Sequence, residues 1–168
     1  MANKEVFIKA IKENERLIYK VASIYTDCTD DRDDLVQEII YNLWKSFEQF
    51  KQNSSLSTWM YRVAMNVSIY YLKKNKRQAD SVAIDSEVLN IKDTDKAEID
   101  DNLRNLQKHI ANLNLLDKGI VMLYLENKSH EEIASITGLS KSNVGTKLNR
   151  IKEKLKVQLV KTNDYGIR

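Results

Sequence analysis

The sequence predicts an all-α protein made of two small helical domains that are joined by an acidic linker. Its 168 residues include no proline and only four glycines, so the usual punctuation of hairpins and tight loops is scarce. Apolar residues recur at spacings of three, four and seven along most of the chain, as they do on the buried face of a helix. Between residues 80 and 101 this period stops and acidic residues accumulate, which indicates a boundary between two domains.

The first domain is expected to span residues 1–78 and to begin with two helices. We place the first helix over residues 5–25, where one face carries the apolar side chains Phe7, Ile11, Ile18, Val21 and Tyr25. The second is expected to start after the acidic cluster of residues 27–34, because aspartate caps a first helical turn and suits the positive end of the helix dipole. Its apolar stripe consists of Leu35, Ile39, Leu43 and Phe47.

A third long helix is expected to complete the first domain. The polar residues 51–55 interrupt the chain, and Ser57 or Thr58 is expected to cap a helix that runs to about Lys74. The apolar stripe of this helix consists of Trp59, Val63, Val67 and Tyr70. Residues 79–101 follow as the linker, which holds eight acids against two bases and therefore has a net charge of −6.

The second domain is expected at residues 102–161, followed by a short tail at residues 162–168. Apolar periodicity predicts helices around Leu103 to Leu113, around Ile120 to Leu125, around Ile133 to Ile136, and from about Lys141 to Val160. The last of these carries seven bases and one acid between residues 141 and 161, and such charge asymmetry points to a nucleic acid as partner.

The stretch from residue 129 to residue 148 has the pattern of a helix-turn-helix. Ser129 and Glu132 can form a capping box on the first helix, Gly138 stands where the chain must turn, and Ser140 can cap the second helix. The outer face of the second helix carries short polar and long cationic side chains, which suit base edges and phosphates in a major groove. These residues are Lys141, Ser142, Asn143, Thr146, Lys147 and Arg150. A plain helical hairpin with a solvated outer face is the alternative.

Two runs in the first domain exceed what helix packing requires. In the first, Asp34, Gln37 and Glu38 lie together on the polar side of an apolar helix, as a docking surface or as an ordinary solvated face. In the second, aromatic and amide side chains precede a basic cluster, which suits single-stranded nucleic acid because rings stack on bases and cations follow the backbone. This run includes Trp59, Tyr61, Asn66, Tyr70, Lys73, Lys74, Lys76 and Arg77. Trp59 belongs to the apolar stripe and is expected in the core.

Composition excludes several other classes of protein. No apolar run approaches the roughly 20 residues that cross a bilayer, and the polar N-terminus does not resemble a signal peptide, so we expect no membrane insertion and a cytoplasmic location. One cysteine, Cys28, excludes an internal disulfide, and with only His109 and His130 there is no set of soft metal ligands. Phosphate-cradling glycine loops and nucleophile motifs are missing as well, so neither an enzyme nor a cofactor is expected.

Taken together, these motifs resemble a bacterial RNA polymerase sigma factor of the extracytoplasmic-function (ECF) type, over nearly the whole chain. The runs at residues 34–38, 43–44 and 58–66 look like sigma region 2, and those at residues 131–134 and 144–148 look like the helix-turn-helix of region 4. The resemblance implies a region 2 helical bundle followed by a region 4 domain. It also implies three partners: core RNA polymerase, promoter DNA as duplex and as melted single strand, and an anti-sigma factor.

The resemblance further implies roles for individual residues. Contacts to the clamp of the largest polymerase subunit correspond to Asp34, Leu35, Gln37 and Glu38. The loop that captures a flipped base of the minus-ten element corresponds to Phe50, Asn53, Ser54, Ser55 and Leu56. The floor of that site corresponds to Tyr61, Arg62 and Asn66, and contacts to backbone phosphates correspond to Lys73, Lys74, Lys76 and Arg77. The reader of the minus-thirty-five element corresponds to Lys141, Ser142, Asn143, Thr146, Lys147 and Arg150.

Three features depart from the family pattern, and one rival function remains open. Gly145 stands where many family members have an arginine or lysine, and His130 replaces a commoner aromatic residue. The capture loop reads Asn-Ser-Ser-Leu at residues 53–56, where many family members have an acidic or glycine residue and an aromatic one, so the promoter sequence is not predicted from the family. The rival is a stand-alone regulator that binds an operator through the helix-turn-helix. It leaves the runs at residues 34–38 and 58–66 unexplained, and an enzyme acting on nucleic acid would need a metal-holding cluster that the sequence lacks.

Overall fold

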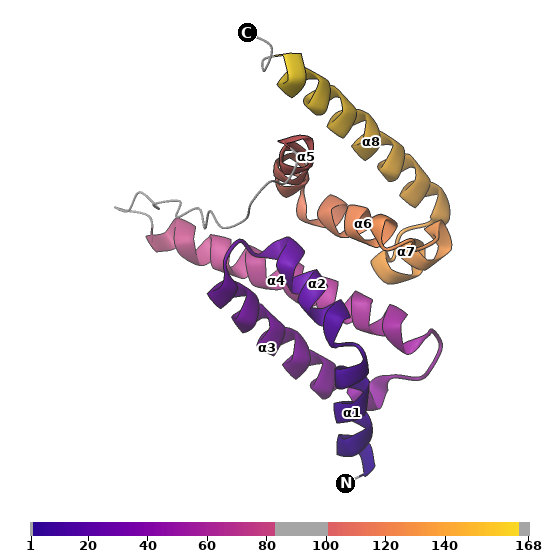
Figure 1. Cartoon of the computed structure of the whole chain (residues 1–168). Helices are drawn as coiled ribbons and strands as arrows, with labels where there is room; N and C mark the ends of the chain where they lie inside the picture. Colours follow the sequence, from indigo (N-terminus) through magenta and orange to yellow (C-terminus); the bar gives the residue numbers. More distant parts are fainter. Residues whose placement is uncertain (1, 83–100, 165–168) are drawn as a thin grey trace.

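The protein forms two helical domains that pack against each other, in a computed structural model that describes residues 2–82 and 101–164 (Figure 1). The first domain consists of α1 (Ala2–Glu13), α2 (Glu15–Tyr25), α3 (Thr29–Ser46), the short 3-10 helix η1 (Phe47–Gln49) and α4 (Leu56–Val82). The second consists of α5 (Asp101–Ala111), α6 (Leu115–Leu125), α7 (His130–Thr137) and α8 (Lys141–Asp164). The predicted all-α class is therefore confirmed for the described residues. Most of the predicted linker, residues 83–100, lies outside them.

The prediction of one continuous helix over residues 5–25 is wrong. The chain forms two helices with a break at Asn14, whose side-chain Nδ2 donates a hydrogen bond to the carbonyl oxygen of Ala10 at 2.9 Å. An asparagine side chain that bonds to nearby backbone competes with the helical pattern, and this explains the break. Phe7 on α1 remains buried because its ring packs edge-on against Trp44 and Phe47, with ring centroids 5.0 and 5.1 Å away.

The expected starts of the next two helices also need correction. α3 starts at Thr29, so all of the acidic cluster except Asp27 lies inside its first turns. Cys28 caps the helix by accepting a hydrogen bond from the backbone N–H of Asp31. The cap of α4 is Ser55, not Ser57 or Thr58: the Ser55 hydroxyl accepts the backbone N–H of Thr58 at 3.2 Å. α4 then continues past the predicted end near residue 74 to Val82.

The helix-turn-helix has the local geometry that its sequence predicts. Ser129 and Glu132 form a reciprocal capping box at the start of α7, and Gly138 ends that helix with a left-handed φ of 77°. The hydroxyl of Ser140 accepts the backbone N–H of Asn143 and so caps α8. Below this turn, α7 and α8 are held by fully buried side chains: Ile133, Val144 and Leu148.

Each domain has its own apolar centre. In the first, α2, α3 and α4 enclose residues that are at most 1% exposed: Ile18, Leu35, Ile39, Leu43 and Met60. In the second, Ile120 and Leu123 of α6 lie at the centre with the side chains of α7 and α8. The two domains meet where α6 packs on α2 and α7 packs on α4. None of the described helices is long and apolar enough to span a membrane.

Alanine substitutions at two glycines of the helix-turn-helix are expected to have opposite effects on stability. Gly138→Ala forces a Cβ into the left-handed region and should lower the free energy of unfolding by about 1–2 kcal/mol. Gly145→Ala, inside α8 with ordinary contact distance to His130, should raise it by up to about 1 kcal/mol. Urea denaturation followed by circular dichroism measures both. Equal effects of the two substitutions would contradict the assigned turn geometry.

Candidate polymerase-docking and nucleic-acid surfaces

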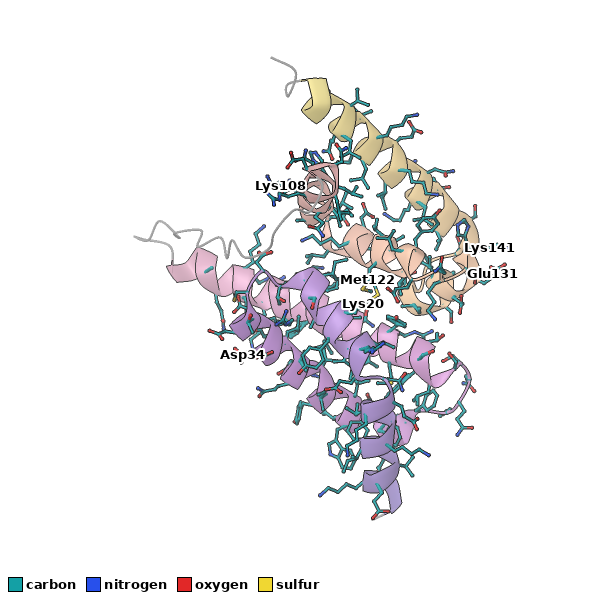
Figure 2. The ribbon with its side chains drawn as sticks, in the orientation of Figure 1. Lys20, Asp34, Lys108, Met122, Glu131 and Lys141 are labelled. Carbon is teal, nitrogen blue, oxygen red and sulfur yellow. The ribbon has the colours of Figure 1, made fainter. Side chains whose placement is uncertain are left out.

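Three polar residues of α3 form an exposed surface, which we call the docking surface: Asp34, Gln37 and Glu38. Asp34 lies at the outer edge of α3, away from the second domain (Figure 2). The sequence did not identify Tyr41, one turn further along the same face, whose side chain is 59% exposed. Leu35 was expected at this surface, but it is completely buried in the domain core. Leu35 is therefore not exposed for contact in this structure, because α3 turns it toward the domain core.

Aromatic residues that pack against one another flank the loop between η1 and α4. Phe50 packs against Trp59 with ring centroids 5.0 Å apart, and Trp59 also contacts Phe47 at 6.2 Å, so Trp59 is half-buried as its place in the apolar stripe suggested. Gln52 has a left-handed φ of 55°, which is rare for a residue with a side chain and which sequence reasoning did not anticipate.

The predicted base-capture residues of this loop differ in accessibility. Asn53 is exposed, whereas Ser54 is half-buried and the Ser55 hydroxyl is engaged in capping α4. Leu56 is half-buried against the domain core. The loop therefore exposes Asn53 and Ser55 and part of Ser54, next in sequence to the packed pair of Phe50 and Trp59.

The surface of α4 next to this loop is partly covered by the second domain. Tyr61 was expected in the floor of a base-binding site, but its side chain is only 5% exposed and Lys128 lies over its ring, 5.5 Å from the centroid. The Nε of Arg62 donates a hydrogen bond to the carbonyl oxygen of Ser135 at 3.1 Å. Asn66, one turn further on, is exposed. In this structure Tyr61 is thus not available to nucleic acid, and Arg62 is already occupied.

The C-terminal half of α4 carries the predicted cationic residues on its surface. All four are exposed: Lys73, Lys74, Lys76 and Arg77. Tyr70, which is 69% exposed, joins three of them and Gln78 around a shallow hollow of about 310 Å³. An exposed ring among cations is the combination that stacks on a base and holds a phosphate backbone.

The outer face of α8 carries the predicted duplex-reading residues, but two of its lysines have partners. Lys141 at the start of α8 forms an ion pair with Glu131 in the first turn of α7 (Figure 2). The ammonium of Lys147 lies 3.4 Å from the carboxylate of Asp117 on α6, so this half-buried lysine also ties α8 to its own domain. Arg150 is exposed at the centre of the outer face.

The short polar residues near the start of α8 are arranged along the same outer face. Ser142, Asn143 and Thr146 are exposed, and the Thr146 hydroxyl donates to the carbonyl oxygen of Ser142 at 3.1 Å. The two residues that depart from the family pattern are neighbours, since a Cβ on Gly145 would lie 3.7 Å from the Nδ1 of His130. Asn143 and Arg150 are thus both exposed on the outer face of α8.

Burial and hydrogen bonding shift four pKa values around these surfaces. Burial raises the pKa of Tyr25, and burial with the nearby charge of Glu126 raises the pKa of Tyr61, so both hydroxyls stay protonated at ordinary pH. A hydrogen bond from Lys141 lowers the pKa of the Glu131 carboxyl. The backbone N–H of Ser129 lowers the pKa of the Glu132 carboxyl in the same way, which keeps the capping box charged at neutral pH.

Comparison with known proteins identifies the family of the chain. The family model for Sigma-70 region 2 matches residues 10–78, and that for Sigma-70 region 4 matches residues 103–155. The matches cover the docking surface, the loop and α4 in the first case and the helix-turn-helix in the second. The chain therefore belongs to the sigma-70 family of RNA polymerase sigma factors.

Relatives in other bacteria define the subgroup. The chain is 29% identical over 164 residues to the RNA polymerase sigma factor SigV of Bacillus subtilis, covering 94% of this chain and 93% of that protein. It is 29% identical over 154 residues to the ECF RNA polymerase sigma-E factor of Haemophilus influenzae, covering 80% and 78% of the two chains. The protein is a sigma factor of the ECF type, and the rival assignment as a stand-alone regulator is not favoured.

Solved structures share the arrangement of the helices. The sigma factor RpoE of Bartonella quintana, in complex with the anti-sigma factor NepR, superposes with a TM-score of 0.72 at 20% identity, over 92% of this chain and 97% of that one. CnrH, in complex with the cytosolic domain of CnrY, gives a TM-score of 0.66 at 18% identity, over 93% and 88% of the chains. At these identities the likeness concerns the fold.

Proposed function

We propose that this sigma factor binds core RNA polymerase through the docking surface of α3, captures a melted base of the minus-ten element at the loop before α4, and reads the minus-thirty-five element with α8. The observation that carries this division of labour is the order of the two family matches, because the first covers the docking surface and the loop before α4 and the second covers the helix-turn-helix. The corresponding functional units are residues 1–78 and 102–161, with residues 79–101 as linker and residues 162–168 as tail.

The chemistry of the exposed side chains supports each assignment. Asp34 and Glu38 offer carboxylates, and Gln37 an amide, on a helix face that the second domain leaves open, so they can accept charge-assisted hydrogen bonds from a basic partner. The floor of Phe50 and Trp59 offsets part of the few kcal/mol that unstacking a base costs.

Duplex recognition is assigned to the face of α8. Asn143 can bond both N6 and N7 on the major-groove edge of an adenine, and Arg150 can reach a guanine or a phosphate. The capping serine and the buried stripe hold their helix in place. Each contact between the helix-turn-helix and DNA adds only a modest affinity. Binding of the minus-thirty-five element therefore adds to the affinity that docking on the polymerase supplies first.

The remaining assignments follow from the family and from the surface between the domains. We infer a cytoplasmic location and no catalytic activity of the protein itself. An anti-sigma factor is an expected partner, since both solved relatives are described in complexes of that kind or with a cytosolic partner domain.

A groove of about 410 Å³ between α2, α5 and α6 is lined by Ile24, Ile110, Val121 and Met122, and a helix bound there would contact both domains.

A pull-down with purified core RNA polymerase tests the docking assignment. The tagged protein is expected to retain core enzyme at stoichiometric amounts, and the retained complex should protect promoter DNA from nuclease around both elements. Specific protection of a duplex by the free protein, without retention of polymerase, would contradict the proposal and favour an operator-binding regulator.

Neutralising the cationic end of α4 is expected to weaken DNA binding in a salt-dependent way. In the complex with polymerase, Lys73→Gln with Lys74→Gln should reduce the slope of log K against log salt by about 2, since each phosphate contact contributes roughly one unit. Titration of a labelled promoter fragment between low and moderate salt measures this slope. The control Lys4→Gln with Lys12→Gln, on exposed positions of the N-terminal helix, should leave it unchanged.

A further inference from the structure

We propose that Asp117 of α6 limits the sequence-independent affinity of this sigma factor for DNA, because it holds Lys147 of α8 in an ion pair within the second domain. This inference rests on the proposed function of α8 and deepens it. Lys147 is one of the residues assigned to the minus-thirty-five element, but its ammonium already lies 3.4 Å from a carboxylate oxygen of Asp117. It must exchange this anion for another before it neutralises a DNA phosphate.

The ion pair is partly removed from solvent. The side chain of Asp117 is 17% exposed and that of Lys147 is 36% exposed. Water and salt therefore screen their attraction less than they screen a pair of exposed side chains. Lys141 and Glu131 provide that comparison at the start of α8, since their side chains are 62% and 63% exposed (Figure 2). Of the two pairs, the one between Lys147 and Asp117 competes more strongly with DNA.

The carboxylate of Asp117 is oriented by a partner other than Lys147. Asp117 lies in the first turn of α6, and its backbone N–H donates to the Oδ1 of the capping residue Asn114 at 2.9 Å. The Nδ2 of Asn114 donates in turn to the Oδ2 of Asp117 at 2.8 Å, while the Oδ1 of Asp117 faces Lys147. A side chain that is already ordered loses little conformational entropy when it binds a cation. Asp117 is therefore a pre-formed acceptor for Lys147.

A second cation of α8 is also engaged by α6. The ammonium of Lys152 donates a hydrogen bond to the hydroxyl of Tyr124 at 3.0 Å and lies 4.3 Å from the centre of that ring. Arg150, in contrast, is exposed and forms no ion pair with any residue that the structure describes. The positive charge that α8 offers to a duplex is therefore smaller than its number of lysines suggests.

The engagement of Lys147 affects mainly the binding of random DNA. Sequence-independent attraction comes from lysines and arginines that neutralise phosphates and release counterions. Such a contact adds affinity for every duplex, whereas a contact from Asn143 to a base edge adds affinity only for a matching sequence. A genome offers a large excess of non-specific sites, so a protein that binds them weakly remains available to core polymerase.

Binding of the full chain to a fluorescent duplex of random sequence tests the proposal. Without polymerase, Asp117→Asn should steepen the dependence of log K on log salt by about one unit, because Lys147 gains a phosphate contact. The gain in affinity over the unsubstituted protein should therefore be about threefold larger at about 50 mM than at about 200 mM salt. Asparagine preserves the size of the side chain and an oxygen for the bond from Asn114, and circular dichroism checks that the fold is unchanged.

A double-mutant cycle separates the ion pair from the general effect of removing an acid. In a Lys147→Gln background, Asp117→Asn should leave the salt slope unchanged, because there is no lysine to release. An equal change of slope in both backgrounds would show that Asp117 acts only through the overall charge of the domain, and would overturn the proposal. Unchanged binding by Asp117→Asn with Lys147 present would overturn it as well.

Glu153→Gln is the matched control on α8 itself. It removes one exposed carboxylate from the helix without releasing Lys147, so the salt slope should stay that of the unsubstituted protein. A slope that rose as much as in Asp117→Asn would again assign the effect to overall charge and contradict the proposal. Failure of the proposed function is a different result: a protein that neither retains core polymerase nor directs initiation, whatever its affinity for random DNA.

Discussion

Replacing Gln37 and Glu38 together by alanine is expected to weaken the binding of core RNA polymerase about tenfold or more, which corresponds to about 1.4 kcal/mol. Both side chains are exposed on the docking surface and available to a partner. Among the described residues, the Glu38 carboxylate accepts a local hydrogen bond from the Nδ2 of Asn42 at 3.1 Å, so the fold should lose little stability when it is removed. Titration of labelled core enzyme with each variant measures the affinity.

A matched control separates docking from a general effect of charge. Glu13→Ala also removes one exposed carboxylate from the first domain, but at the end of α1 and away from α3. It should leave the affinity for core enzyme within twofold. If Glu13→Ala weakened binding as much as the double variant, or if the double variant bound normally, the assignment of α3 as the docking helix would be incorrect.

The second large effect is expected at the duplex-reading face of α8. Asn143→Ala should weaken the free energy of binding by about 1–3 kcal/mol when the minus-thirty-five element has its preferred base pair. When that base pair is already altered, the substitution should have almost no effect. Arg150→Ala should weaken binding more evenly across sequences if its guanidinium contacts phosphate. Open-complex formation by the reconstituted holoenzyme, on a promoter library with single-base changes in the element, measures both profiles.

The control for this experiment is Asn112→Ala, an exposed asparagine in the link between α5 and α6. It makes the same chemical change without touching α8 and should give the unsubstituted profile. An Asn143→Ala profile that keeps every base preference of the unsubstituted protein would remove Asn143 from the readout.

The features that the sequence predicted well are local ones. The capping box of Ser129 and Glu132, the left-handed Gly138 and the capping Ser140 all depend on residues at most a few positions apart, so their spacing alone specifies the geometry. The stripe of Leu35, Ile39 and Leu43 was also predicted, and all three are fully buried. Because Leu35 belongs to this buried stripe, it cannot also lie on the exposed docking surface. The helical periodicity of the sequence already implied that the two assignments conflict.

The features that the sequence did not predict depend on competition or on distance. The break at Asn14 arises because a side-chain bond to Ala10 competes with an apolar period that continues through it. The hydrogen bond from Arg62 to Ser135 joins residues 73 positions apart, and no local pattern encodes such a contact. One signal was available: Gly119 lies inside a helix, where glycine lowers stability, and a glycine at such a position indicates a close approach by another element.

Run-off transcription with purified core RNA polymerase and a library of promoter fragments tests the central claim most directly. With the protein present, core enzyme is expected to initiate at defined sites that share two sequence elements, and Gln37→Ala with Glu38→Ala should reduce these products about tenfold at limiting protein. Initiation that is unchanged by the protein, combined with specific binding of duplex DNA by the protein alone, would contradict its function as a sigma factor.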